Sequence, residues 1–95
     1  MERLTATELL DAHHTFPSDH AFRAIVRADP AEVDAVLVSV AAFCGLTDLE
    51  DRVVRVPSSA GKWLSLRMAL PCDSATRVLE IYAHLQALPQ VVRCL

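Results

Sequence analysis

Residues 53–70 read VVRVPSSAGKWLSLRMAL, two apolar alternating segments joined by a short loop. Apolar side chains recur at every second position, first at Val54 and Val56, then at Leu64, Leu66, Met68 and Leu70. A period of two is typical of antiparallel strands with one buried face. Gly61 suits a loop position that needs a positive φ. The stretch therefore predicts a β-hairpin with strands over 52–57 and 62–70.

Four further elements are expected around this hairpin. Asp29 and Pro30 are typical of a helix start, and Gly45 is typical of a helix stop. Elsewhere, apolar residues recur at strand or helix spacing between prolines and polar clusters. The expected elements are a strand over 20–27, a helix over 30–44, a helix over 74–87 and a strand over 90–94.

The resulting order is β-α-β-β-α-β, which predicts an α+β, ferredoxin-like fold. Right-handed crossovers give a four-stranded antiparallel sheet of order 4-1-3-2, with two helices on one face. Residues 1–15 have weak periodicity and are expected to form a flexible tail. Residues 16–95 are expected to form a single domain.

Composition indicates a globular protein. The 95 residues are 53% hydrophobic and 22% charged, with a net charge of −3. No apolar run approaches the roughly 18–20 residues of a membrane helix, and the start does not resemble a signal peptide. We therefore expect a cytoplasmic protein without a membrane partner. The cysteines are odd in number and widely spaced, so we expect free thiols at apolar sites for Cys44, Cys72 and Cys94.

Three segments carry a resemblance to a known family: FPSDHAFRAIV (16–26), PSSAGKWLS (57–65) and YAHLQALPQVVRCL (82–95). They are similar to the YbeD-like family, whose members typically have FP-x-D-F-P, PSS-x-G-K/N-Y and a closing V-R/K-M-V-L. The resemblance covers roughly residues 16–95, with His20 at a usually aromatic position and Trp63 at a tyrosine position. It implies a small bacterial protein of unknown function with a ferredoxin-like fold.

The family fold also resembles the ACT regulatory domain, which binds amino acids at subunit interfaces. ACT domains usually have a glycine in the loop after the first strand. Here that loop, residues 27–30, has none. An ACT-like ligand-sensing role is therefore kept as an alternative only.

One face of the predicted sheet is left without helices, and basic residues gather on it. The residues expected there, with a binding role, are Arg23, Arg27, Arg55, Trp63 and Arg67. No acidic residue lies within the strands expected at 20–27, 62–70 and 90–94. Arginine beside an aromatic ring suits an anionic partner. The alternative is a solvated sheet face, because arginine stems also cover apolar surface well.

The hairpin loop offers Ser58, Ser59, Gly61 and Lys62, which resemble a phosphate-binding loop in composition. GxxxxGK[ST] is absent and a strand follows, so a structured hairpin is the favoured interpretation, with anion contact as the alternative. No residue pattern predicts a metal site, a cofactor or a catalytic group.

These observations predict a non-enzymatic regulatory or protein-interaction module. Its expected partner is another protein, or a second copy, that brings acidic or anionic groups to the open sheet face. Single-stranded nucleic acid, with Trp63 as a stacking platform, is the alternative, although the chain has few aromatic residues for that role.

Overall fold

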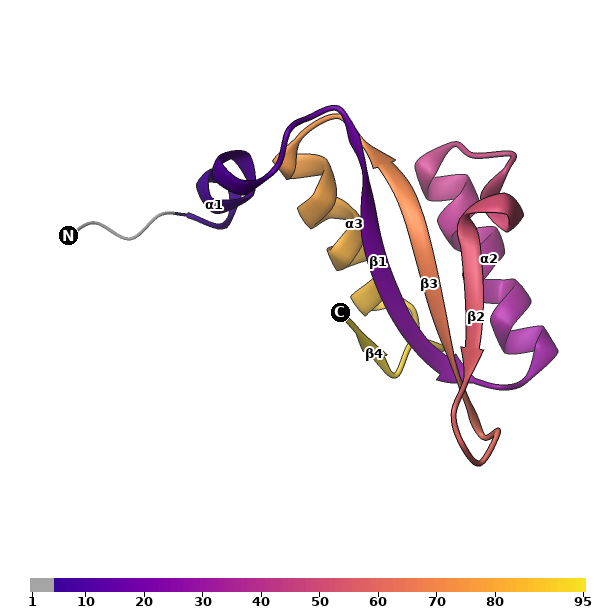
Figure 1. Ribbon diagram of the computed structural model, residues 1–95. Helices are drawn as coiled ribbons and strands as arrows, with labels where there is room; N and C mark the ends of the chain where they lie inside the picture. Colours follow the sequence, from indigo (N-terminus) through magenta and orange to yellow (C-terminus); the bar gives the residue numbers. More distant parts are fainter. Residues whose placement is uncertain (1–4) are drawn as a thin grey trace.

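The computed structural model describes residues 5–95, which form three α-helices and one four-stranded sheet (Figure 1). In chain order the elements are α1 (Ala6–His13), β1 (Ser18–Arg27), α2 (Pro30–Cys44), the 3-10 helix η1 (Leu49–Arg52), β2 (Val53–Pro57), β3 (Trp63–Cys72), α3 (Ala75–Ala87) and β4 (Arg93–Cys94). Every pair of neighbouring strands is antiparallel. The α+β class is therefore confirmed.

The strand order is β2-β3-β1-β4, which is the predicted 4-1-3-2 order seen from the opposite edge. Helices α2 and α3 lie on the same side of the sheet (Figure 1). Strand β2 is an edge strand, so Pro57 lies where a missing N–H is tolerated.

Local capping explains where the two covering helices begin and end. The Asp29 side chain accepts hydrogen bonds from the N–H groups of Ala31 and Glu32, and Gly45 ends α2 with a left-handed φ of 65°. The Ser74 hydroxyl accepts from the N–H of Arg77 and begins α3. Helix α2 has the predicted bounds, and α3 begins one residue later than predicted.

The core lies between the sheet and these two helices. On β3, Leu66, Met68 and Leu70 are at most 2% exposed, and they pack with apolar residues of both helices. The cysteines contribute to this core as free thiols, with Cys72 buried and Cys44 and Cys94 partly buried. Burial raises the pKa of the Cys44 and Cys72 thiols, so both stay protonated at neutral pH.

Two central strands extend further than the sequence predicts, and the last strand is shorter. Strand β1 begins at Ser18, and β3 continues through Pro71 to Cys72. Strand β2 pairs with β3 only as far as Met68, so Pro71 lies where β3 has a single neighbour. The expected strand over 90–94 is reduced to Arg93–Cys94.

The N-terminal segment contains a helix, α1, whose Thr5 side chain caps the N–H of Glu8. Its Leu10 packs against the core. Residues 1–4 of the tail expected over 1–15 lie outside the described residues, and the boundary at residue 16 stays a prediction. Within residues 5–95, no helix is long and apolar enough to cross a membrane.

Candidate functional site

The candidate site is the sheet face that α2 and α3 leave uncovered, which we call the open face. Residues paired directly across neighbouring strands point to the same side of a sheet, so the register assigns this face. The open-face pairs between β1 and β3 are Ala21–Ala69, Arg23–Arg67, Ile25–Ser65 and Arg27–Trp63. Strand β2 adds Val54 and Val56, and β4 adds Arg93.

Arg55 does not belong to the open face, and its predicted place there is wrong. It pairs with buried Leu66, so it lies on the helix-covered side. There its guanidinium binds Glu50 at 3.0 Å, and it lines a depression with Pro30 and Asp34 of α2. The phase of β2 is thus reversed, and Val54 instead of Arg55 faces outward.

The central pair of the open face consists of two arginines. Arg23 and Arg67 are directly opposite each other, which places their Cβ atoms about 4.5–5.5 Å apart. Both are exposed, and neither forms an ion pair with another described residue. Like charges in this position are destabilising. The pair therefore creates an unbalanced positive charge at the centre of the face.

Trp63 lies at one end of the open face, beside two cations. One is Arg27, its partner on β1, and the other is Lys62, the residue before it. The Arg27 guanidinium is 5.8 Å and the Lys62 ammonium 5.5 Å from the centre of the indole ring. These distances fit cation–π contacts. Trp63 is partly exposed, so it presents apolar surface together with the two charges.

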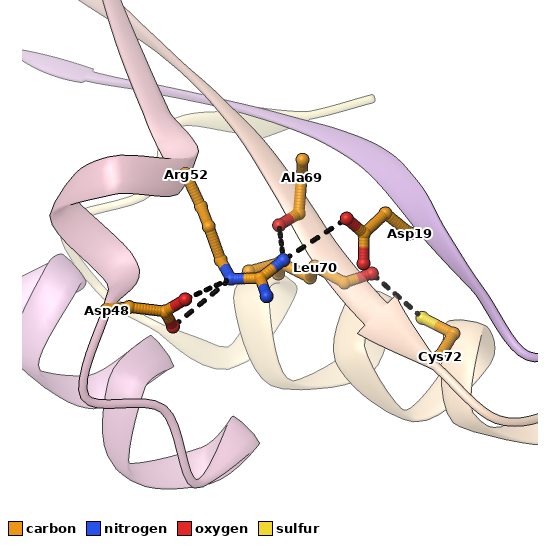
Figure 2. Close-up of polar contacts among 6 residues, drawn as sticks. All are labelled: Asp19, Asp48, Arg52, Ala69, Leu70 and Cys72. Carbon is orange, nitrogen blue, oxygen red and sulfur yellow. Dashed lines mark hydrogen bonds and ion pairs between the residues drawn. The ribbon is translucent and has the colours of Figure 1, made fainter.

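At the other end of the face, Arg52 has its charge neutralised (Figure 2). Its guanidinium binds Asp48 at 3.1 Å and Asp19 at 3.2 Å, and it donates to the carbonyl of Ala69. Strand β2 begins only at Val53, so Arg52 reaches a β3 carbonyl one residue beyond the Val53–Met68 pair. Hydrogen bonding to Asp48 raises the pKa of Arg52, with burial opposing and the charges of Asp48 and Asp19 assisting.

The open face has two shallow depressions. The alanine depression, of about 550 Å³, is lined by the apolar residues Ala21, Val54, Ala69 and Leu95. The tryptophan depression, of about 240 Å³, is lined by Ile25, Val56, Trp63 and Ser65. Arg23 and Arg67 line both depressions, so the arginine pair separates them.

The hairpin loop is structured by its own hydrogen bonds, which favours the structural interpretation of Ser58, Ser59, Gly61 and Lys62. The Ser58 hydroxyl accepts from the N–H of Trp63, and Gly61, with a φ of 73°, donates to the Ser58 carbonyl. Of these four loop residues, only Ser58 lines the tryptophan depression. Anion contact at Ser59 and Lys62 stays a prediction.

A serine–histidine pair joins the two covering helices, and sequence reasoning missed it. Ser39 Oγ lies 2.8 Å from His84 Nε2, and the His84 ring stacks on Phe43 at 4.2 Å. Arg77 also lies over Phe43 and donates to its carbonyl. None of these residues lines the depressions described above. The arrangement therefore serves helix packing.

The structure also adds three charged open-face residues that sequence reasoning did not place there. Arg93 reaches the face through its pairing with Ile25, and Arg52 through its contact with Asp19. Asp19 itself lies within β1 because that strand begins two residues earlier than predicted. The expectation that no acid lies within these strands is therefore wrong at one end of the face. Among the described residues, no group of His, Cys, Asp or Glu could hold a metal ion.

Comparison with known proteins adds a family but no activity. Residues 11–95 match the family described as "Protein of unknown function (DUF493)". YbeD is a member of this family, so the resemblance found in the sequence is confirmed. No curated protein and no solved structure matches the chain. The chain belongs to the DUF493 family of proteins of unknown function.

Proposed function

We propose that this protein is a non-enzymatic regulatory or protein-interaction module that binds an acidic partner protein through its open face, with the cytoplasm as the setting. The observation that carries the proposal is the Arg23–Arg67 pair, which lacks ion pairs among the described residues. A partner carboxylate would offset the repulsion between the two guanidinium groups and accept charge-assisted hydrogen bonds from them. Binding would thus remove an unfavourable feature of the free protein.

The apolar surface beside the arginines supports a protein as the partner. Val54 is 61% exposed and Leu95 is 51% exposed, and both line the alanine depression. Apolar surface next to charge is typical of a protein interface, where aromatic residues and arginine are enriched. A small anion would cover the arginines and leave this apolar surface in water.

The chain offers a matched pair of variants to test the proposal. Arg67→Glu changes the open face, and Arg55→Glu makes the same charge change on the covered side of the same sheet. We expect pull-down from a cell extract to lose its acidic partner with Arg67→Glu and to retain it with Arg55→Glu. Capture by the wild type should weaken with salt, since exposed charges are screened beyond about 8–10 Å at physiological ionic strength and added salt shortens this distance.

Two results would contradict this proposal: equal capture by wild type and Arg67→Glu, or equal loss with both variants. Light scattering on the purified chain tests the related expectation that the partner is a second copy. In that case the wild type would be dimeric and Arg67→Glu monomeric.

Single-stranded nucleic acid remains the alternative, because Trp63 has Arg27 within cation–π distance on the open face. Lys62 also lies over the indole ring, which reduces its use as a stacking platform. Retention on a labelled oligonucleotide at rising salt separates the two functions. Strong, Trp63-dependent retention would favour the nucleic-acid function. ACT-like ligand sensing stays an alternative without an observation that favours it.

A further inference from the structure

We propose that the occupant of the open face is an amphipathic α-helix of the partner protein, lying along β1 and β3. An acidic side chain of this helix is placed over Arg23 and Arg67, and apolar side chains enter the two depressions on either side. This inference rests on the proposed function and specifies the chemistry of the partner.

The architecture of the sheet favours a helix. In the middle of the open face, β1 has β3 on one side and β4, at Ala24 and Ile25, on the other, and β3 lies between β1 and β2, so this part of the described sheet presents side chains and no free strand edge. The opposite face is already covered by α2 and α3, whereas no helix of residues 5–95 forms such a layer on the open face (Figure 1). Each central strand has 10 residues, or about 33 Å, which a helix of about 20 residues matches in length.

The floor of the alanine depression allows close approach. Ala21 and Ala69 face each other there, and their small side chains leave room that larger residues would fill. Val54 on β2 and Leu95 at the other side of the sheet also line the depression and are exposed. A branched apolar side chain from the partner helix would therefore be in contact with apolar groups from several strands.

The tryptophan depression offers a second apolar contact and one polar group. Ile25, Val56 and Trp63 line it. Ser65 also lines it, and its hydroxyl oxygen is buried without a hydrogen-bond partner within the described part of the chain. Buried polar groups are normally paired, so the Ser65 hydroxyl, once turned toward the depression, can bond a polar atom of the partner.

The register sets the spacing that the partner helix must have. The Ala21–Ala69 and Ile25–Ser65 pairs are four residues apart along β1, or about 13 Å, with the Arg23–Arg67 pair midway. A helix rises about 1.5 Å per residue, so this distance corresponds to about eight or nine helical residues. The expected pattern is therefore an apolar residue, an acidic residue about four positions later, and a second apolar residue about four positions after that.

The test is a peptide selection, which can be run before the natural partner is identified. The full chain is used to select from a display library of random peptides of about 20 residues. The Arg23→Glu, Arg67→Glu variant serves for counter-selection, after circular dichroism has shown that it folds. Ala69→Phe is an independent variant that fills the alanine depression and leaves both arginines in place.

We expect enriched peptides to share the apolar–acidic–apolar spacing and to gain helical circular dichroism on binding. Their affinity should fall about tenfold or more for the charge-reversed variant, as for a truncated charge pair at an interface. Peptides with lysine in place of the acidic residue should prefer that variant to the wild type. Ala69→Phe should also weaken binding.

Three outcomes would overturn the proposal of a partner helix. They are a selection in which no peptide binds the wild type better than the charge-reversed variant, enriched peptides that stay extended when bound, or enriched peptides without an acidic residue. These outcomes are distinct from failure of the proposed function. If Arg67→Glu loses the natural partner but the selection yields extended acidic peptides, the proposed function stands and the helix does not. If Arg67→Glu retains the natural partner, the proposed function itself is wrong.

Discussion

The two faces of β3 carry side chains under different constraints, although they alternate along one strand. On the covered face, Leu66 and Leu70 are 0% exposed and pack against two helices. On the open face, Arg67 and Ala69 are exposed, and no element of the described chain covers them. A change on the covered face must therefore alter the packing, whereas a change on the open face need not. Residue choice on the open face is free to serve binding.

The arginines of the open face sharpen this comparison. Arg52 is neutralised by Asp48 and Asp19, so the chain does balance a positive charge where the structure requires it. Arg23 and Arg67 are left opposite each other without an acid among the described residues. Stability alone would favour an oppositely charged pair at these positions. The contrast supports a binding role for the arginine pair.

The largest effect is expected on the covered face. Leu66→Ala removes a fully buried side chain, so the free energy of unfolding should fall by about 2–5 kcal/mol. Arg67→Ala, the next residue on the opposite face, should change it by no more than about 0.5 kcal/mol. Urea denaturation of both variants measures the difference. Similar losses for the two would show that the faces are not constrained differently.

A smaller effect of opposite sign is expected at the arginine pair. Arg67→Glu places a carboxylate opposite Arg23, so the free energy of unfolding should rise by about 0.2–1 kcal/mol while partner capture is lost. Arg55→Glu, which removes the ion pair with Glu50, should give no such rise. Denaturation and pull-down on the same preparations measure both quantities. If Arg67→Glu destabilises the protein, the two arginines do not repel each other in the folded state.

Filling the alanine depression should alter binding with little effect on stability. Ala69→Phe adds an exposed ring on the open face, and the free energy of unfolding should change by no more than about 0.5 kcal/mol. Partner capture should weaken, because the ring occupies the depression. Ala42→Phe, at an exposed position of α2, is a control with the same added volume. Loss of capture with both variants would contradict a specific role for the depression.

The smallest expected effect concerns pH. His20 has the covered-face register of β1, with its ring 5.1 Å from Phe22. Burial, assisted by the charge of His14, lowers the pKa of His20 below 6.5. The His20 side chain therefore binds a proton more readily in the unfolded chain than in the folded protein. The stability that neutral His20 contributes is present above pH 6.5, and it is lost as the pH falls below that value.

Replacing His20 by phenylalanine removes this titration, so the variant should lose less stability than the wild type between about pH 7.5 and about pH 5.5. Thermal unfolding at the two pH values measures the difference. Parallel pH dependence in the two proteins would assign the effect to other groups. The arginines of the open face, by contrast, stay charged throughout this range.

Sequence patterns were most reliable where structure is set by neighbouring residues. The bounds of α2 follow from Asp29 and Gly45, whose conformational preferences act within one turn of the helix. The alternation along residues 20–27 and 62–70 placed Arg23, Arg27, Trp63 and Arg67 on the open face, as the strand pairing confirms.

The same reasoning failed for β2, because the phase with two valines, Val54 and Val56, faces outward, whereas the phase of Val53 and Arg55 faces the covering helices. The alternation predicted that Val54 and Val56 lie on the covered face. Of the three valines of β2, only Val53 lies there, packed against the core. Arg55 shares that face at the sheet edge, where Glu50 offers an ion pair. The phase of β2 depends on its pairing with β3, which no local pattern in β2 contains.

The two covering helices, the four strands, their order, the sheet topology and the family resemblance could be predicted from the amino-acid sequence, because caps, periodicity and loop residues act over a few positions. Helices α1 and η1 were not predicted. The full membership of the open face could not be predicted. The placement of Arg52, Arg93 and Asp19, and the removal of Arg55, all depend on pairing or contact between segments distant in the chain. Such register is set by the competition among long-range contacts, and a shift of one residue exchanges the two faces of a strand.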